Sequence, residues 1–552
     1  MSPILALLLA ASAISPRGAA ATASPLASQA AADVLAAGGN AVDAAVAAAY
    51  VLSVVANTSS GLGGGGFALV YVAKEDRVHA IDFREVAPAA ATPTMFAGAP
   101  QGPGRPKPSL DGGLAVAVPS AARGYAWLAR RFGTWKPPAL VEPAARIAER
   151  GFAVGPKHAL LAKERLECLR ARPAAAAEYL VKGPDGAYVP PEIGHRLVRR
   201  DLARTLRLLG KDPDALNRGP LARRIVEAAR ADGGILTEAD LAAVAVREHE
   251  PLVGSYRGHR IASMPLPSSG GAIVIALLQA LEGEDPKAGG YRNERWLHAM
   301  AELEKRLFAR RATLGDPALV PGAEAAVREL VSPAFAARLR AEVGERASDP
   351  AAGGGPAEGE HTNHVAVVDR EGNAVSLTTT VNAPFGSCVL VPGTGILLND
   401  QMDDFDAAPG TPNYFGVVGT GANAPAPGKV PLSSMAPTIV FDAAGKVELV
   451  VGAAGGSTIP TTVAQAISNV IDLGMPLEQA LGAPRIHHQW RPRTLRVEPF
   501  GLEAATIRAL EARGHTLDLR KAPWGEAAAV GRLGTMWEGA SDPRWEGRPA
   551  AP

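Results

Sequence analysis

The feature that most constrains the fold of this chain is an abrupt change in sequence pattern at residue 362. Residues 120–350 show mostly helical periodicity. A linker over residues 349–361 follows, which is rich in Gly and Pro and otherwise holds no apolar residue larger than alanine. Beyond it the apolar residues alternate, which is typical of strands. A helix-rich part followed by a strand-rich part predicts an α+β fold.

The first strands after the linker predict a hairpin. Residues 363–368 and 374–381 alternate in the manner of two strands, and a turn over 370–372 joins them. The turn length places Thr362 opposite Thr380, where facing Cβ atoms lie about 4.5–5.5 Å apart. On spacing alone, such a pair is more often a sheet-stabilising contact than a catalytic one.

The N-terminal half carries two further local signals. Residues 27–50 predict two helices separated at Gly38-Gly39-Asn40. Four consecutive glycines, Gly63 to Gly66, precede a predicted strand over residues 67–72 and allow another backbone to approach closely. A phosphate-binding loop is disfavoured, because no Lys-Ser/Thr follows and the loop leads into a strand.

Composition excludes several classes of function. The 552 residues are 47% hydrophobic and 20% charged, which is the balance of a globular protein. A net charge of +1 offers no electrostatic case for nucleic acid binding. The sequence has no apolar run of the length that a membrane-spanning helix requires.

The cysteines and histidines suggest neither a disulfide framework nor a metal site. Cys168 and Cys388 lie far apart in the sequence, so we expect free thiols in the core. The pairs His361/His364 and His487/His488 lack the Cys or carboxylate companions of a zinc site. We expect no metal and no cofactor.

The N-terminus predicts export. An apolar run from Ile4 to Ile14 resembles the core of a signal peptide, placed at residues 1–21, with a small-residue exit sequence near Ala13. The basic segment that usually precedes such a core is missing, so an alanine-rich helix start is the alternative. We expect a periplasmic or secreted protein.

The run from Thr362 to Asn382 resembles the start of the small subunit of gamma-glutamyltransferases, which usually reads T-T-H. Asn363 replaces the second threonine here. Segments similar to the same family occur in order over roughly residues 25–545: Gly38–Ala49, Ser59–Phe67, Asp82–Pro88, Met264–Gly271, Met300–Lys305, Gly395–Phe405, Pro431–Thr438, Gly455–Thr458 and Ala483–Trp490.

The resemblance implies a four-layer αββα sandwich of the N-terminal-nucleophile hydrolase type, built jointly by two subunits cut from one chain. The cut would fall between His361 and Thr362, giving a large subunit over residues 22–361 and a small subunit over 362–552. The two would stay together as a heterodimer. Thr362 would then use its free α-amine as a base and attack gamma-glutamyl amides such as glutathione. Amino acids, peptides or water would accept the glutamyl group.

The resemblance also assigns roles within the site. Thr380 would hydrogen-bond the nucleophile, and the backbone of Gly455 and Gly456 would stabilise the oxyanion. Arg84 would bind the glutamyl α-carboxylate, because a guanidinium can bind it with two hydrogen bonds. The residues that match further carboxylate donors are Ser433 and Ser434, and those that match ammonium acceptors are Asn382, Gln401 and Asp404.

A lid segment departs from the family pattern. Residues 408–416 match a lid that often carries a tyrosine bonded to the asparagine at position 382. The ungapped match puts Phe415 at that position, with Tyr414 one residue earlier. We therefore expect a lid without the closing hydrogen bond to Asn382.

Two other functions remain open at this stage. An amidase similar to cephalosporin acylases would act on glutaryl groups, which lack the α-amine and do not need Asp404. A binding protein that retained the fold without self-cleavage is the second, and the presence of Thr362, Thr380 and Gly455-Gly456 argues against it.

Overall fold

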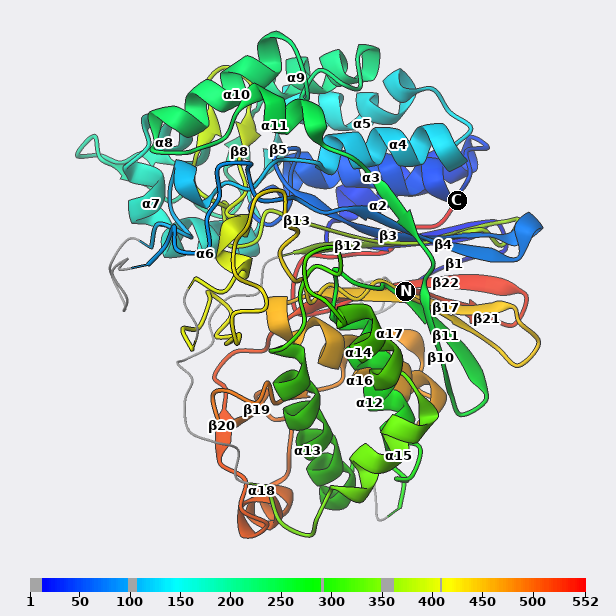
Figure 1. The fold of residues 1–552 in the computed structure, drawn as a ribbon. Helices are drawn as coiled ribbons and strands as arrows, with labels where there is room; N and C mark the ends of the chain where they lie inside the picture. The colour runs from blue at the N-terminus through cyan, green and yellow to red at the C-terminus, as the bar shows by residue number, and fades with distance from the viewer. Residues whose placement is uncertain (1–11, 98–106, 289–291, 349–361, 408–409) are drawn as a thin grey trace.

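Two antiparallel sheets pack face to face between two layers of helices (Figure 1). The computed structural model describes residues 12–97, 107–288, 292–348, 362–407 and 410–552. The six-stranded sheet has the order β2 (Gly18–Thr22), β12 (Asn363–Asp369), β13 (Ala374–Thr380), β3 (Gly65–Val72), β4 (Arg77–Phe83) and β9 (Arg247–His249). The seven-stranded sheet has the order β1 (Ser12–Ser15), β22 (Met536–Ser541), β21 (Glu526–Leu533), β17 (Val447–Ala454), β16 (Thr438–Phe441), β11 (His259–Ser263) and β10 (Leu252–Tyr256).

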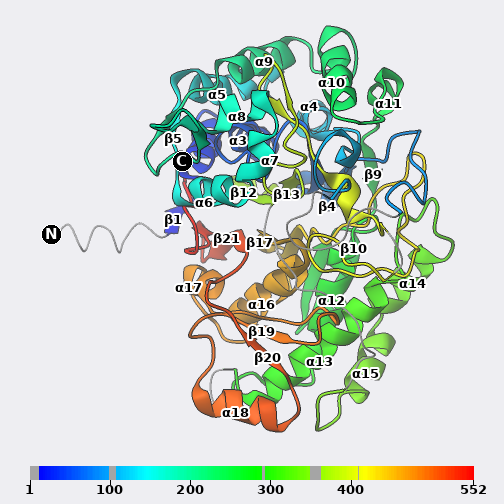
Figure 2. The same cartoon turned by 90° about the vertical axis from the view of Figure 1, so that its left-hand side faces the viewer.

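Each sheet is covered on its outer face by its own helices, as Figure 2 shows from a second side. On the side of the six-stranded sheet lie α2 (Pro25–Ala36), α3 (Ala41–Val55), α4 (Ala121–Phe132), α5 (Pro137–Arg150), α6 (Pro156–Glu164), α7 (Leu166–Arg170), α8 (Pro173–Tyr179), α9 (Arg200–Lys211), α10 (Pro220–Ala231) and α11 (Glu238–Ala243). On the side of the seven-stranded sheet lie α12 (Gly270–Leu281), α13 (Glu294–Arg311), α14 (Ala323–Leu330), α15 (Pro333–Ala341), α16 (Ile459–Ile471), α17 (Leu477–Gly482) and α18 (Ala504–Ala512). Among the described residues, no helix has both the length and the apolar composition needed to span a membrane.

Short elements complete the described chain. The small strands are β5 (Phe152–Ala153), β6 (Val181–Lys182), β7 (Tyr188–Val189), β8 (Arg196–Leu197), β14 (Leu390–Val391), β15 (Ile396–Leu397), β18 (Ile486–His487), β19 (Leu495–Val497) and β20 (Leu517–Leu519). The 3-10 turns are η1 (Ala73–Glu75), η2 (Gly113–Ala115), η3 (Gln401–Asp404) and η4 (Gly456–Thr458). Two of these turns, η3 and η4, carry residues of the site described below.

The predicted break between the first two helices is confirmed, and local chemistry explains it. Gly38 lies just after the end of α2 and adopts a φ of 90°, a left-handed conformation that favours glycine. The Asn40 side chain accepts hydrogen bonds from the backbone amides of Val42 and Asp43, while Asp43 accepts one from the Asn40 amide. This reciprocal cap satisfies amide groups at the start of α3 that have no partner within the helix.

The chain before residue 362 and the chain after it share both sheets. In the six-stranded sheet β12 and β13 lie between β2 and β3, and in the other sheet β16 lies beside β11. The inner faces meet where β12 packs against β17 and β21. The predicted αββα sandwich, built jointly by both parts, is confirmed.

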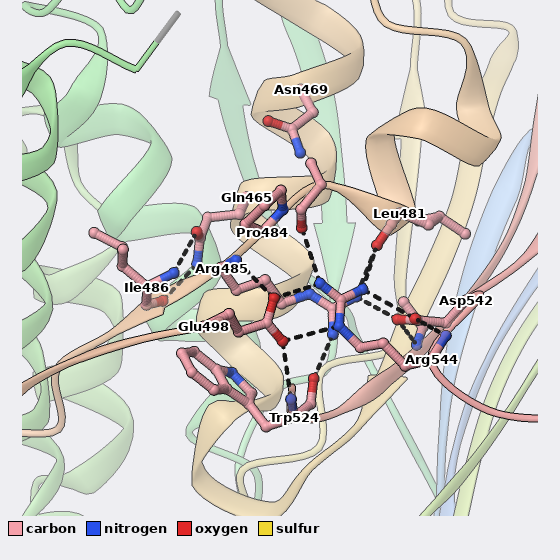
Figure 3. A network of polar contacts seen from close by, with 12 residues as sticks. Gln465, Asn469, Leu481, Pro484, Arg485, Ile486, Glu498, Trp524, Asp542 and Arg544 are labelled. Carbon is pink, nitrogen blue, oxygen red and sulfur yellow. Dashed lines mark hydrogen bonds and ion pairs between the residues drawn. The ribbon is translucent and has the colours of Figure 1, made fainter. Parts of the chain in front are cut away.

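A buried polar network ties the C-terminal strands to the segment before β18 (Figure 3). Asp542 accepts hydrogen bonds from the guanidinium groups of Arg485 and Arg544, and Arg544 also binds Glu498 at 2.5 Å. Burial opposes the charge on Asp542, but the two arginines outweigh it and lower the pKa of that carboxyl. Breaking such a network leaves buried charges without partners.

The expectation of free thiols is wrong. Cys168 and Cys388 form a disulfide, with Cα atoms 6.1 Å apart, although 220 residues separate them in sequence. Cys168 lies in α7, and the turn after β13 carries Cys388 toward it. Sequence distance is a poor guide here, because the tertiary fold brings the two Cα atoms within the range that a bridge needs.

The expected boundary at residue 21 is also corrected. Residues 12–22 form β1 and β2, which pair with β22 and β12 in the two sheets. Ala19, Ala20 and Ala21 are fully buried, so this segment is part of the core. Residues 1–11 and the linker 349–361 lie outside the described residues.

Removing the carboxylate at the centre of the polar network should strongly destabilise the fold. We expect Asp542→Ala to lower the free energy of unfolding by about 3–5 kcal/mol, because two buried arginines lose a partner. Urea titration followed by fluorescence measures this. Asp518→Ala is the matched control, since Asp518 pairs with a half-exposed Arg520 and its loss should cost about 0–1 kcal/mol. Equal losses in the two variants would contradict the importance of the network.

Candidate active site

The β12–β13 hairpin sets the first geometry of the site. Asn363 pairs with Thr379 and His364 with Thr378, as the turn length predicted. One step further, the Thr362 hydroxyl lies 3.5 Å from the Thr380 hydroxyl, and the Asn382 amide donates to the latter at 2.9 Å. The predicted Thr pair is therefore confirmed, and both side chains are buried. His361 lies outside the described residues.

The glycine run from Gly63 to Gly66 explains how the chain fits beside this hairpin. A Cβ on Gly64 would lie 2.0 Å from the carbonyl oxygen of Thr380, and one on Gly63 would lie 2.1 Å from that of Leu397. Any larger residue would push β3 away from the strand that carries Thr380. The close approach that the sequence predicted is thus an approach to the site hairpin itself.

Gly455 and Gly456 form the turn between β17 and α16. Their φ angles are 136° and 55°, which side chains with a Cβ rarely adopt. Gly456 begins η4, which runs directly into α16, so the backbone amides here lie at the positive end of a helix. Gly456 and Thr362 line the same pocket. The turn can offer amide donors to a developing negative charge beside Thr362.

Arg84 and Asp404, the two charged residues that we expect to bind the ligand, form an ion pair with each other. Arg84 donates a hydrogen bond to Asp404, and the Gln401 amide donates to the same carboxylate oxygen at 2.6 Å. The Arg84 backbone is held by Asp82, whose carboxylate accepts from its amide at 2.7 Å. Arg84 is buried, so this ion pair sits in the wall of the pocket rather than on the surface.

Most of the predicted site residues line one pocket. The predicted residues found there are Arg84, Thr362, Thr380, Asn382, Gln401, Asp404, Phe415, Ser433, Ser434 and Gly456. Ser433 comes close to α12, because its carbonyl accepts hydrogen bonds from the amide and hydroxyl of Ser269. Asn382 adopts a φ of 79° and donates to the Asp400 carbonyl at 3.1 Å. The tertiary fold therefore gathers residues from distant segments around Thr362.

The two aromatic residues of the segment that matches the lid, Tyr414 and Phe415, contact different parts of the protein. The Phe415 ring lies against Gly456, where an added Cβ would come within 2.2 Å of a ring carbon. The Tyr414 hydroxyl instead donates to Glu164 at 2.7 Å. Asp403 faces away from the pocket, accepting from Ser109 and from the Tyr414 amide. Of the two rings, that of Phe415 therefore lines the pocket.

Two charged residues of the site were not singled out in the sequence. Arg311, the last residue of α13, lines the pocket and donates to the Ser269 hydroxyl at 3.0 Å. Burial lowers its pKa, with Asp404 acting in the opposite direction. Glu85 lies behind Arg84 at 3.6 Å, and burial raises its pKa to about 7. Arg311 follows another arginine at a helix end and resembles a surface charge, whereas Glu85 lies within Asp82–Pro88, one of the segments similar to the family.

Comparison with known proteins agrees with this geometry. The family model described as gamma-glutamyltranspeptidase matches residues 27–551. A glutathione hydrolase proenzyme from Escherichia coli (strain K12) is 40% identical over 527 residues, covering 94% of this chain and 89% of the relative. An acylase ACY 1 proenzyme from Pseudomonas sp. (strain SE83) is 37% identical over 545 residues, covering 97% and 93%.

Solved structures give the same picture. The cephalosporin acylase from Bacillus halodurans superposes with a TM-score of 0.84 at 29% identity, over 98% of this chain and 96% of that one. The Helicobacter pylori gamma-glutamyltranspeptidase superposes with a TM-score of 0.54 at 36% identity, over 58% of this chain and 90% of that one. With its matched family model, its proenzyme relatives and its paired threonines, the chain belongs to the gamma-glutamyltranspeptidase family.

Proposed function

We propose that Thr362 is the nucleophile of a self-processing gamma-glutamyltransferase and glutathione hydrolase. The observation that carries this proposal is the Thr362 hydroxyl beside Thr380, in one pocket with the Arg84–Asp404 ion pair. Membership of the family supports the reaction class, and relatives named glutathione hydrolase proenzyme support both the substrate and the need for maturation. The residue roles below are our assignments.

Maturation supplies the base that Thr362 lacks within the intact chain. Its backbone nitrogen is then an amide, which cannot accept a proton from the hydroxyl. In the proposed cut, the Thr362 oxygen attacks the His361 carbonyl, the peptide bond becomes an ester, and water opens that ester. The freed α-amine has a reference pKa of about 7.7–8.0, so it can accept the hydroxyl proton at neutral pH. The flexible composition of the linker at 349–361 suits this approach.

In the mature enzyme, Thr362 would attack the δ-carbonyl of a gamma-glutamyl amide. A bond forms between its oxygen and that carbon, the C–N bond breaks, and the leaving amine takes the proton. The amides of Gly455 and Gly456 would stabilise the oxyanion, because their turn leads into a helix and Gly456 lines the same pocket as Thr362. Water, an amino acid or a peptide would then release the glutamyl ester.

The Arg84–Asp404 pair suits the α-carbon end of the donor. That end carries a carboxylate and an ammonium on one carbon, so its two charges can replace the two partners that already face each other. Gln401 and Asn382 would add acceptors, and Ser433 and Ser434 would add donors. Arg311 supplies a second buried cation that favours the carboxylate.

A glutaryl amidase is the alternative. The similarity to an acylase ACY 1 proenzyme and to a cephalosporin acylase supports this alternative. A glutaryl group brings a carboxylate without an ammonium, so binding it to Arg84 would leave Asp404 without an incoming cation. The direct pairing of Arg84 with Asp404 therefore favours a donor that carries both charges.

The lid should cover the site without locking it. Phe415 packs on the Gly456 turn but has no hydroxyl to bond Asn382. A lid held without that bond opens more readily and admits water to the glutamyl ester. We therefore assign hydrolysis a large share of turnover even when an amine acceptor is present.

We also assign the protein to the periplasm or the exterior of the cell. The disulfide supports this, since such bonds persist in oxidising compartments. A leader cut that keeps β1 and β2 in their sheets must fall before Ser12. The large fragment would then end at His361, and the small one would span residues 362–552.

Replacing the nucleophile should abolish maturation. We expect Thr362→Ala to remain one chain, because the oxygen that attacks the preceding carbonyl is gone. N-terminal sequencing and a reducing denaturing gel give the readout. Thr362→Ser is the matched control and should still be cut, since it keeps a hydroxyl. Cleavage of Thr362→Ala at the same bond would rule out this mechanism.

Removing Asp404 should separate glutamyl from glutaryl donors. A hydrogen bond to a charged group contributes roughly 1.5–3 kcal/mol. We therefore expect Asp404→Ala to lower kcat/KM on a gamma-glutamyl anilide about 10- to 150-fold. The matched glutaryl anilide should lose nothing, because Arg84 is freed from its competing carboxylate. Equal losses on both anilides would mean that Asp404 only supports the structure.

Adding a hydroxyl to the lid should favour transfer over hydrolysis. One neutral hydrogen bond is worth about 0.5–1.5 kcal/mol, so Phe415→Tyr should raise the transfer-to-hydrolysis ratio about 2- to 10-fold. Product analysis with a dipeptide acceptor measures the ratio. Phe500→Tyr makes the same chemical change at a fully exposed ring and should leave the ratio unchanged. An unchanged ratio in Phe415→Tyr would refute this view of the lid.

A further inference from the structure

The disulfide spans the bond that maturation cuts. Cys168 belongs to the part of the chain before Thr362, and Cys388 belongs to the part after it. Once the peptide bond before Thr362 is broken, the two fragments have separate backbones. The pair of sulfurs is then a covalent connection between two chains rather than a crosslink within one.

The bond lies inside a contact that both parts build. Arg165 donates to Asp111 at 2.7 Å and to the carbonyls of Pro384 and Gly386 at 3.1 Å. The Phe385 ring packs edge-on against Tyr179 with centroids 5.0 Å apart. Apolar side chains of α6–α8 cluster with those around Cys388, which is fully buried. Contacts other than the sulfur bond therefore also hold the two segments together.

The same helices hold the lid. Glu164, the last residue of α6, accepts the hydrogen bond from Tyr414, whose neighbour Phe415 lines the pocket. Cys168 follows Glu164 by four residues and lies in α7. Tyr414, a lid residue of the small fragment, is thus bonded to α6 of the large fragment. The disulfide joins the neighbouring helix α7 to the small fragment.

We propose that Cys168–Cys388 is an inter-fragment disulfide, which keeps the two products of self-cleavage covalently joined and fastens α6–α7 under the lid. The inference rests on the proposed cleavage at Thr362. In forming the bond the two thiols lose two protons and two electrons. A protein disulfide of an oxidising compartment accepts them by thiol–disulfide exchange and leaves as a dithiol.

A pair of gels tests the linkage on the mature wild-type protein. The sample is alkylated with iodoacetamide during denaturation, so that thiols cannot exchange, and is run with and without reductant. We expect one band at the mass of the whole chain without reductant and two bands with it. Two bands under both conditions would overturn the proposal while leaving self-cleavage intact. One band under both conditions would overturn both, because no separate fragments would exist to be joined.

Single variants test the assignment of the two sulfurs. Cys168→Ser and Cys388→Ser should each be cut normally and each run as two bands without reductant. Heat inactivation then tests the fastening: reductant should speed inactivation of the wild type about tenfold or more, and should not affect either variant. A joined band that persists in either variant would overturn the pairing. Equal effects of reductant on wild type and variants would overturn the fastening.

Discussion

The register of the β12–β13 hairpin is the constraint on which the site depends. A shift by one residue would turn Thr380 to the opposite face of the sheet, away from Thr362. The register is held from both sides, because β2 pairs with β12 and β3 pairs with β13. The glycines at the start of β3 allow that neighbour to lie close to the carbonyl of Thr380. The Thr362 hydroxyl is thus positioned by the strands beside it, and strands hold side chains more precisely than loops do.

The charged side chains around this hydroxyl have little contact with solvent. Arg84, Arg311 and Asp404 are all partly or fully removed from solvent. Burying charges is costly unless they are paired, and Arg84 meets that requirement with Asp404 in front and Glu85 behind. An amino acid that enters with both of its own charges can exchange partners with the pair. In the function that we propose, the site favours donors by their zwitterionic end, while Thr362 would act on the other end.

The cleavage that we propose before Thr362 would impose a further demand. In each sheet the strands that follow residue 362 lie between strands that precede it, so two such fragments could not separate without opening the core. The disulfide adds a covalent restraint at the edge, where the lid and α6–α7 meet away from the sheets. Packing of the sheets would thus hold the residues around Thr362 in place, and the disulfide would hold the helices on which the lid rests.

The sequence by itself determined the local elements and the reactive pair. The break at Gly38 to Asn40, the hairpin with Thr362 facing Thr380, and the switch from helical to alternating pattern all follow from short-range periodicity and turn chemistry. Family resemblance added the sandwich and most of the pocket residues. Only the tertiary structure decided that Cys168 meets Cys388, that Arg311 lines the pocket, and that residues 12–22 are core strands. These contacts join residues tens to hundreds of positions apart, and such proximity depends on how layers pack rather than on any local pattern.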